Sequence, residues 1–269
     1  MSHDDASGRP TTISDVEWKT RCDLAALYRL VALYGWDDLI FTHISARVAA
    51  KHSQVKQPDG SYAPSERDHF LINPYGTFFP EMTASALVKI DIDGKVIGET
   101  SSMVNPAGFT IHSAVHSAVG DAHFVIHLHT DAMTGVSAQK EGLLPLSQNA
   151  LLLRPQLAYH DYEGVALDLE ERQRIIDDLG GKRFLMLRNH GTLAWGMSAA
   201  EAFAGIYFLE QACRQQIAAL SAGRDGVLEV GQDVQDKVAP LAAGVGFVGG
   251  LIWPGLMRKL NREMPGFDT

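Results

Sequence analysis

The stretch FVIHLHTDAMTGVSA, residues 124–138, places His127 and His129 one residue apart inside an apolar run. Its apolar first half predicts a β-strand, and DAMTGVSA predicts the start of a short helix. Because residues i and i+2 of a strand share a face, the two imidazoles are expected to point the same way, about 6–7 Å apart along the backbone. They could then bind one metal ion, or they could be two half-buried polar residues at the end of a strand.

Helices and strands alternate on both sides of this stretch. Ser14 with Glu17, and Ser198 with Glu201, match the capping-box pattern that opens helices, and DG at 93–94 predicts a hairpin turn. Strands are expected at residues 40–48 and 69–76 and on both sides of the NHG turn at 189–191. Helices are expected at residues 14–34, 107–119, 168–180, 198–223 and 254–263, the last after a glycine-rich segment. This order predicts one α/β domain whose mixed or antiparallel sheet is covered by helices.

The composition is that of a globular protein and limits its partners. The chain has 269 residues, of which 46% are hydrophobic and 20% are charged, so it can bury a full core. A formal net charge of −9 without a basic cluster argues against nucleic acid as a partner. The two cysteines, Cys22 and Cys213, are far apart and fit a reducing compartment.

The sequence also argues against export and membrane insertion. The polar, acidic start lacks the pattern of a secretion signal. The longest apolar stretch, VAPLAAGVGFVGGLIW at 238–253, is too short and too rich in glycine to be expected to span a membrane. We therefore expect a cytoplasmic protein without a membrane partner.

Further histidines lie in positions from which they could join His127 and His129. His190 is in the NHG turn, where a side chain can be aimed into a cleft. His112 and His116 are four residues apart, so they share one face of the helix that leads into residues 124–138. They form either a polar stripe on that helix or part of a functional site, and His43 is equally open to both interpretations.

Five segments together carry a resemblance to a known family. They are NPAGFTIHSAVHSAV (105–119), VIHLHT (125–130), GLLPLSQNAL (142–151), YHDYEG (159–164) and LRNHGTLAWG (187–196). In combination they resemble the class II aldolase/adducin superfamily, and most of all its bacterial adducin-like members. The resemblance covers residues 14–222, and the tail at 251–267 resembles the end of the same bacterial proteins.

The resemblance implies a three-layer α/β/α domain with a central, largely antiparallel sheet, usually assembled as a homotetramer. The expected organisation is a disordered tail at residues 1–13, the aldolase/adducin-like domain at 14–222, and a C-terminal extension at 223–269 packed on the domain.

The resemblance also implies a metal site. Enzymes of the family bind zinc through an HxH pair on a strand and a third histidine in an NHG turn, which correspond to His127, His129 and His190. In these enzymes the metal polarises a carbonyl or hydroxyl group and stabilises an enediolate. The expected ion is Zn²⁺ or another divalent metal such as Mn²⁺, Co²⁺ or Fe²⁺.

This sequence departs from the family pattern where phosphate would bind. The phosphate-binding serines of the sugar-phosphate enzymes correspond to Pro106 and Ala107, and their phosphate-binding asparagine corresponds to His43. The threonine of a second phosphate-binding turn corresponds to Tyr75, and only the turn glycine, Gly76, is retained. These departures argue against a phosphorylated sugar as substrate.

The family's acidic ligand and acid/base is also missing, because its position is Gly108. The candidates for its catalytic role are His112, one turn later on the same helical face, and Glu163 of YHDYEG. Glu163 could equally be a loop carboxylate that caps a local group. The residues expected to contact the substrate are His43, Gly76 and His116.

Two classes of function follow. The first is a metal-dependent, aldolase-like lyase that acts on a small hydroxy- or keto-acid or an unphosphorylated sugar through an enediolate. The second is a non-catalytic module like the adducin head, or an inactive aldolase homologue. Adducins act through a long basic tail, which is not present in this sequence, so the sequence favours the enzyme. The expected partners are a small-molecule substrate and further copies of the chain.

Overall fold

The predicted first helix is present as α1 (Asp15–Leu33) in the computed structural model, which describes residues 10, 12–98, 100–164 and 170–269. The Ser14 hydroxyl accepts a hydrogen bond from the Glu17 amide at 3.2 Å, which confirms Ser14 as the N-cap. The buried Glu17 carboxylate pairs with Arg21 and Lys89, each at 3.0 Å. Most of the predicted disordered tail, and the predicted start of a helix at residue 168, lie outside the described residues.

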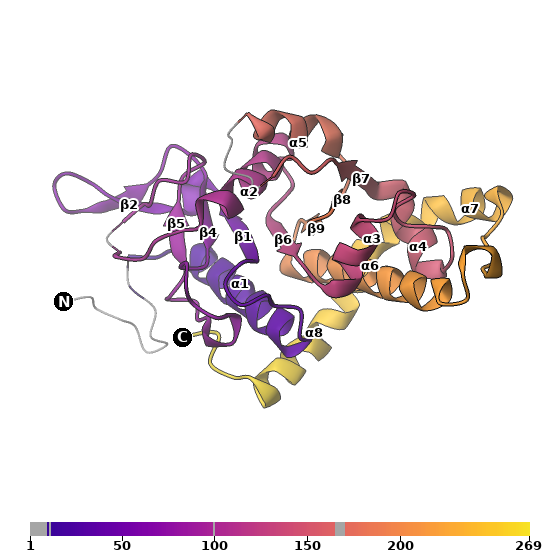
Figure 1. Cartoon of the computed structure of the whole chain (residues 1–269). Coiled ribbons are helices and arrows are strands. Elements are labelled where there is room, and N and C mark those ends of the chain that lie inside the picture. The colour runs from indigo at the N-terminus through magenta and orange to yellow at the C-terminus, as the bar shows by residue number, and fades with distance from the viewer. Residues whose placement is uncertain (1–9, 11, 99, 165–169) are drawn as a thin grey trace.

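A seven-stranded sheet forms the centre of the molecule (Figure 1), with the spatial order β5-β4-β1-β6-β9-β8-β7. Its strand pairs are antiparallel except for β7 with β8, which is parallel. The strands are β1 (His43–Val48), β4 (His69–Ile72), β5 (Val88–Ile90), β6 (Phe124–Leu128), β7 (Leu157–His160), β8 (Phe184–Leu187) and β9 (Gly191–Gly196). The largely antiparallel sheet is therefore confirmed.

Alternating side chains of the strands build a core on each face of this sheet. On one face, α2 (Pro106–Ala118) and α5 (Glu171–Leu179) cover Val125 and Leu193. On the other face, α1, α3 (Asp131–Ser137), α6 (Ala199–Leu220) and α8 (Val245–Glu263) cover Ile44 and Ile126. Strand β8 is apolar on both faces because helices cover both, and the chain has the three-layer α/β/α fold (Figure 1).

Shorter elements join these layers. Strands β2 (Gln54–Lys56) and β3 (Tyr62–Pro64) pair as a hairpin in the segment between β1 and β4. The predicted turn at 93–94 is present, because Gly94 has a positive φ and Ile90 bridges Val96 across it. The remaining helices are α4 (Gln148–Leu153), α7 (Gln232–Val238), η1 (Ala50–His52), η2 (Phe79–Glu81), η3 (Arg154–Gln156), η4 (Arg224–Gly226) and η5 (Ala239–Gly244).

The last helix is longer than predicted. The sequence predicted a helix only from residue 254, after a glycine-rich segment, but α8 begins at Val245 and includes those glycines. A Cβ on Gly249 would lie 2.6 Å from the carbonyl oxygen of Ala200, so this glycine lets α8 approach the start of α6 closely. Packing against α6 therefore outweighs the cost of about 1 kcal/mol that a helical glycine carries.

By length and composition, the helical run Gln232–Glu263 could cross a membrane, and it is the one such run among the described residues. It consists of α7, η5 and α8, and Leu256 and Leu260 of α8 are buried in the core beneath α1 and α6. A single run of this kind is weak support for a membrane span, and 17% of its most apolar 18-residue window is buried in the fold. The absence of a membrane partner stays a prediction.

The Tyr28 hydroxyl links the beginning of strand β1 to the end of its neighbour β4. Tyr28 is fully buried on α1, and its oxygen accepts hydrogen bonds from the amides of Ile44, at 2.9 Å, and Asn73, at 3.1 Å. Its single hydrogen is shared between the carbonyl of Ile44 and the side-chain oxygen of Asn73. Burial raises the pKa of this phenol, so it stays neutral and able to donate.

We predict that Tyr28→Phe lowers the free energy of unfolding by about 2–4 kcal/mol, because two buried amides lose their acceptor. Urea unfolding followed by circular dichroism measures this change. Tyr62→Phe is the matched control, since Tyr62 is 46% exposed, and it should change stability by less than about 0.5 kcal/mol. Equal stabilities for the two variants would contradict the role of Tyr28.

Candidate metal centre

The sheet brings together three histidines from two distant segments. His127 is in β6, His129 follows the last residue of that strand, and His190 lies in the turn between β8 and β9. Strand β9 pairs antiparallel with β6, with Leu128 opposite Thr192, so the turn before β9 lies at the end of β6. Asn189 in this turn has a φ of 58°, a left-handed conformation that asparagine tolerates well.

The three imidazoles converge through their Nε2 atoms. The Nε2 atom of His129 lies 2.9 Å from that of His127 and 3.0 Å from that of His190. All the candidate ligand atoms of the trio lie within 4.8 Å of one another. Strand β6 ends at Leu128, so His129 lies one residue beyond it. The sequence predicted that both histidines lie within the strand, on one face.

The far sides of two of these rings are held by acceptors. Nδ1 of His127 donates to the carbonyl oxygen of Thr192 at 3.0 Å, and Nδ1 of His129 donates to the Asp38 carboxylate at 3.1 Å. A carbonyl or carboxylate oxygen can only accept, so each Nδ1 carries the hydrogen. In a neutral imidazole the Nε2 atom is then a bare lone pair, which is the form that binds a metal.

The residues present therefore fit a metal ion. Two neutral Nε2 atoms 2.9 Å apart have no hydrogen to share, and their lone pairs repel. Protonation is unfavourable at His127 and His190, because burial lowers the pKa of His127 well below its usual value and that of His190 to about 4. A cation among the three nitrogens would remove the repulsion, and borderline-soft divalent ions such as zinc prefer such ligands.

His112 and His116 do not lie at this centre. Both are buried between α2 and the sheet, and both nitrogens of each ring are hydrogen-bonded. His112 bonds to His43 and Ser45, while His116 bonds to Ser45 and the carbonyl oxygen of Ala122. Both nitrogens of each ring are thus engaged within the fold, and the catalytic role of His112 and the substrate contact of His116 stay predictions.

His43 occupies the space beside Gly108. A Cβ on Gly108 would lie 2.4 Å from Cδ2 and 2.6 Å from Nε2 of His43, closer than atoms can approach. His43 pairs with His127 across β1 and β6, and their ring centroids are 5.0 Å apart. His43 thus fills the place that a side chain at position 108 would take, and it lies beside the candidate metal centre.

The other predicted site residues lie in different surroundings. Nε of Arg174 donates to both oxygens of the Glu163 carboxylate, at 2.8 and 2.9 Å, and Nη2 of Arg174 donates to one of them; this ion pair lowers the pKa of Glu163. Its neighbour Tyr162 lies with its ring centroid 6.3 Å from that of His190. Gly76 has a φ of 97° in a turn, which explains a glycine there. The catalytic role of Glu163 and the substrate contact of Gly76 stay predictions. The side chains of Pro106 and Ala107 lie outside the described part of the chain.

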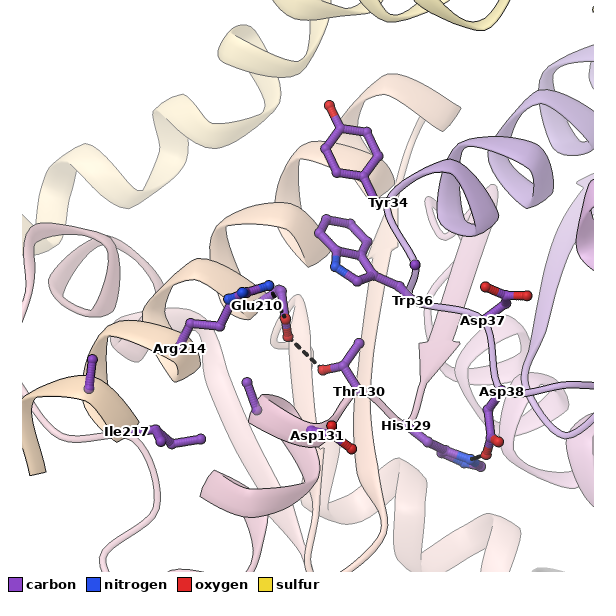
Figure 2. Close-up of a pocket in the computed structure, with 13 residues that line it drawn as sticks. Tyr34, Trp36, Asp37, Asp38, His129, Thr130, Asp131, Glu210, Arg214 and Ile217 are labelled. Carbon is purple, nitrogen blue, oxygen red and sulfur yellow. Dashed lines mark hydrogen bonds and ion pairs between the residues drawn. The ribbon is translucent and has the colours of Figure 1, made fainter. Parts of the chain in front are cut away.

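A cleft of about 720 Å³ borders the metal centre at the His129–Asp38 pair (Figure 2). Glu210 lines it, is 2% exposed, and accepts a hydrogen bond from the Thr130 hydroxyl at 2.5 Å. Burial raises the pKa of Glu210. The charged residues described in the lining are Asp37, Asp38, Asp131, Glu210 and Arg214. The cleft is therefore predominantly acidic.

The sequence did not reveal the residues that orient the imidazoles. Asp38 is 91 residues from His129 in the chain, and Thr192 acts through its backbone carbonyl, so no side-chain pattern marks either. Ser45 could have been suspected, because it is two residues from His43 and shares its face of the strand.

Comparison with known proteins agrees with this geometry. Residues 22–217 match the family described as the class II aldolase and adducin N-terminal domain. The chain belongs to the class II aldolase and adducin family. A crystal structure of an aldolase II superfamily protein from Pseudomonas syringae is 43% identical in sequence and has a TM-score of 0.86. The match covers 96% of this chain and 98% of that chain.

Relatives in this family fall into two groups. A Caulobacter vibrioides protein whose name assigns it provisionally to the class 2 aldolases is 59% identical over 256 residues, or 95% of this chain and 94% of that protein. Rat alpha-adducin is 46% identical over 204 residues, which are 75% of this chain but only 26% of the adducin. Membership of the class II aldolase family supports lyase chemistry, whereas likeness to adducin keeps a second kind of role open.

We predict that Gly108→Ala destabilises the protein by about 1–3 kcal/mol, because the added methyl group must displace the buried His43 ring. Urea unfolding measures the change. Gly250→Ala is the control, since a Cβ on this helical glycine meets open space, and it should be neutral or stabilising by up to about 1 kcal/mol. Wild-type stability in Gly108→Ala would show that His43 does not depend on the glycine.

Proposed function

We propose that this chain is a metal-dependent, aldolase-like lyase. The observation that carries the proposal is the convergence of three Nε2 atoms, two of them on rings whose Nδ1 hydrogens are bound elsewhere. His127, His129 and His190 would hold the metal, with Asp38 and the carbonyl of Thr192 fixing two of the rings. Three histidines are the protein ligands of many catalytic zinc sites. The expected ion is zinc or, alternatively, manganese, cobalt or iron(II).

The bound metal would supply Lewis-acid chemistry by holding the negative charge that develops on a substrate oxygen, as in an enediolate. The chain would supply the ligands and the orientation of their rings, and the covered faces of the sheet would limit the access of water to His127, which is 1% exposed. Glu163 remains a proposed acid/base, although its ion pair with Arg174 must open first.

The surroundings of the site support an unphosphorylated sugar over a hydroxy- or keto-acid. The carboxylates of Asp37, Asp38, Asp131 and Glu210 border the adjacent cleft, and Arg214 is the cationic side chain among the described lining residues apart from His129. Such a lining repels anions and offers acceptors to hydroxyl groups. A neutral polyhydroxy compound therefore fits the cleft better than a phosphate or carboxylate.

We further propose that the protein forms a homo-oligomer, with four subunits by its resemblance to the family. Large apolar side chains on the C-terminal elements support self-association, because they are exposed in the single chain. They are Leu241, Phe247 and Leu251, with exposed fractions of 62%, 73% and 64%.

We predict that protein purified without chelator, or given zinc afterwards, holds about one divalent ion per chain, and that His127→Ala or His129→Ala loses it. Removing one of three ligands leaves too few for stable binding. Inductively coupled plasma mass spectrometry measures the metal content. His52→Ala is the control, since His52 lies outside the cluster, and it should keep the metal. An empty wild-type site after zinc addition would contradict the proposal.

We predict that the zinc-, manganese- or cobalt-loaded protein cleaves a member of a panel of free sugars, 2-hydroxy acids and 3-keto acids. His190→Ala should lower the rate on the order of 10²-fold or more, because transition-state charge loses its stabilisation. Product detection by mass spectrometry measures turnover, with His52→Ala as the control. Persistent inactivity of the metal-loaded protein, combined with tight binding of a protein partner, would favour a non-catalytic module, the role that likeness to adducin keeps open.

A further inference from the structure

Four buried polar side chains form a line behind the metal centre. His43 and Ser45 are two residues apart on β1, and His112 and His116 are four residues apart on α2. These spacings place each pair on one face of its element, so the strand pair and the helix pair meet where α2 covers the sheet. All four are at most 4% exposed. Hydrogen-bonding groups buried to this degree need partners.

Consecutive hydrogen bonds link the four side chains. Nδ1 of His43 lies 2.8 Å from Nε2 of His112, and Nδ1 of His112 lies 2.5 Å from Oγ of Ser45. The same Oγ lies 2.8 Å from Nε2 of His116, whose Nδ1 lies 2.9 Å from the carbonyl oxygen of Ala122. The chain of hydrogen bonds therefore ends on a group that can only accept.

That last group sets the direction of every bond. Nδ1 of His116 must donate to the Ala122 carbonyl, so a neutral His116 accepts at Nε2 from the Ser45 hydroxyl. Ser45 has then used its only hydrogen and must accept from Nδ1 of His112. His112 in turn accepts at Nε2 from Nδ1 of His43. Neutral His43 is left with a bare lone pair on Nε2.

Burial keeps the rings of His112 and His116 neutral, as the series requires. It is the main cause that lowers the pKa of His116 to about 3, and it lowers the pKa of His112 well below its usual value. Arg47, which donates to the carbonyl oxygen of His116, adds a positive charge that disfavours a cation there.

The free Nε2 of His43 is on the side of the ring that faces Gly108. Its Nε2 and Cδ2 atoms lie against Gly108, within 2.6 Å of where a Cβ would stand. The centroid of the His43 ring lies 5.0 Å from that of the His127 ring. The fold thus presents a fourth imidazole lone pair beside the three that converge.

We propose that His116, Ser45 and His112 are positioning residues that fix His43 as its Nδ1–H tautomer. His43 then accepts, through Nε2, a hydrogen bond from a hydroxyl group of the ligand held at the metal centre. The hydroxyl contact rests on the proposed metal-dependent function, whereas the tautomer does not. The contact would favour a substrate with a hydroxyl group next to the oxygen that binds the metal.

Histidine-selective ¹⁵N labelling and long-range ¹H–¹⁵N correlation spectra test the tautomer directly. In the wild-type protein, with and without added zinc, the ring signals of His43, His112 and His116 should each show a protonated Nδ1 and an unprotonated Nε2. A protonated Nε2 on His43, or a cationic His43 ring at pH 7, would overturn the proposal. The wild-type spectrum decides this point even if a variant fails to fold.

Ser45→Ala removes the middle of the chain while preserving volume. His43 should then lose its single tautomer, although zinc stoichiometry stays unchanged because Thr192 and Asp38 still orient the ligands. Ser113→Ala is the matched control. Ser113, on α2, is buried like Ser45, but its hydroxyl donates to the carbonyl of Thr110 one turn earlier in the same helix. Ser45→Thr, which retains a hydroxyl, should restore the wild-type spectrum. An unaltered His43 signal in Ser45→Ala would contradict the positioning role.

Dihydroxyacetone, the smallest unphosphorylated keto sugar, is the probe for the hydroxyl contact. Added to the zinc-loaded protein, it should shift the Nε2 signal of His43 but not that of His52. If the His43 Nε2 signal does not shift with saturating zinc and millimolar dihydroxyacetone, the contact is overturned. The contact is also overturned if zinc alone changes this signal as it changes the Nε2 signals of the three proposed ligands. If zinc does not bind, the proposed function fails, but the tautomer spectrum still decides the hydrogen-bond chain.

Discussion

An imidazole offers a lone pair on one nitrogen only when the other nitrogen holds the hydrogen, and the site depends on this constraint. The acceptors behind His127 and His129 decide which nitrogen faces the centre. The backbone carbonyl of Thr192 is fixed by the pairing of β9 with β6, whereas Asp38 comes from the loop that follows α1. The sheet and the loop after the first helix therefore act together to orient these imidazoles toward one another.

The same constraint extends into the layer between α2 and the sheet. A buried polar group without a partner costs on the order of 1–3 kcal/mol, so a run of histidines can replace apolar packing only if every nitrogen is used. His112 and His116 meet this requirement through His43, Ser45 and the carbonyl of Ala122, whereas Nε2 of His43 has no partner in this chain of hydrogen bonds. Polarity in this layer is thus part of the folded core and is not an exposed stripe.

Membership of the class II aldolase and adducin family gives this arrangement its context. The relatives include a provisionally assigned class 2 aldolase and the N-terminal part of adducins. What separates a catalytic member from a scaffold is the chemistry of the site, since fold alone does not determine function. Here three imidazoles converge, and His43 fills the space beside Gly108.

The sequence by itself determined the alternating helices and strands, the N-caps at Ser14 and Ser198, and the three histidines that could share an ion. These features are local, because capping, periodicity and i, i+2 spacing act within a few residues. It could not determine that α8 begins at Val245, since only contact with α6 makes those glycines favourable in a helix.

Only the tertiary structure decided which histidines face the centre. His112 and His116 share a helical face that the sequence identified, but their partners come from β1 and from the backbone at Ala122. Asp38, equally, is brought to His129 by the packing of distant segments. The hydrogen-bond partners that orient these imidazoles are distant in sequence or belong to the backbone, so no local sequence pattern identifies them. The orientation of each ring is therefore set only when the layers pack together.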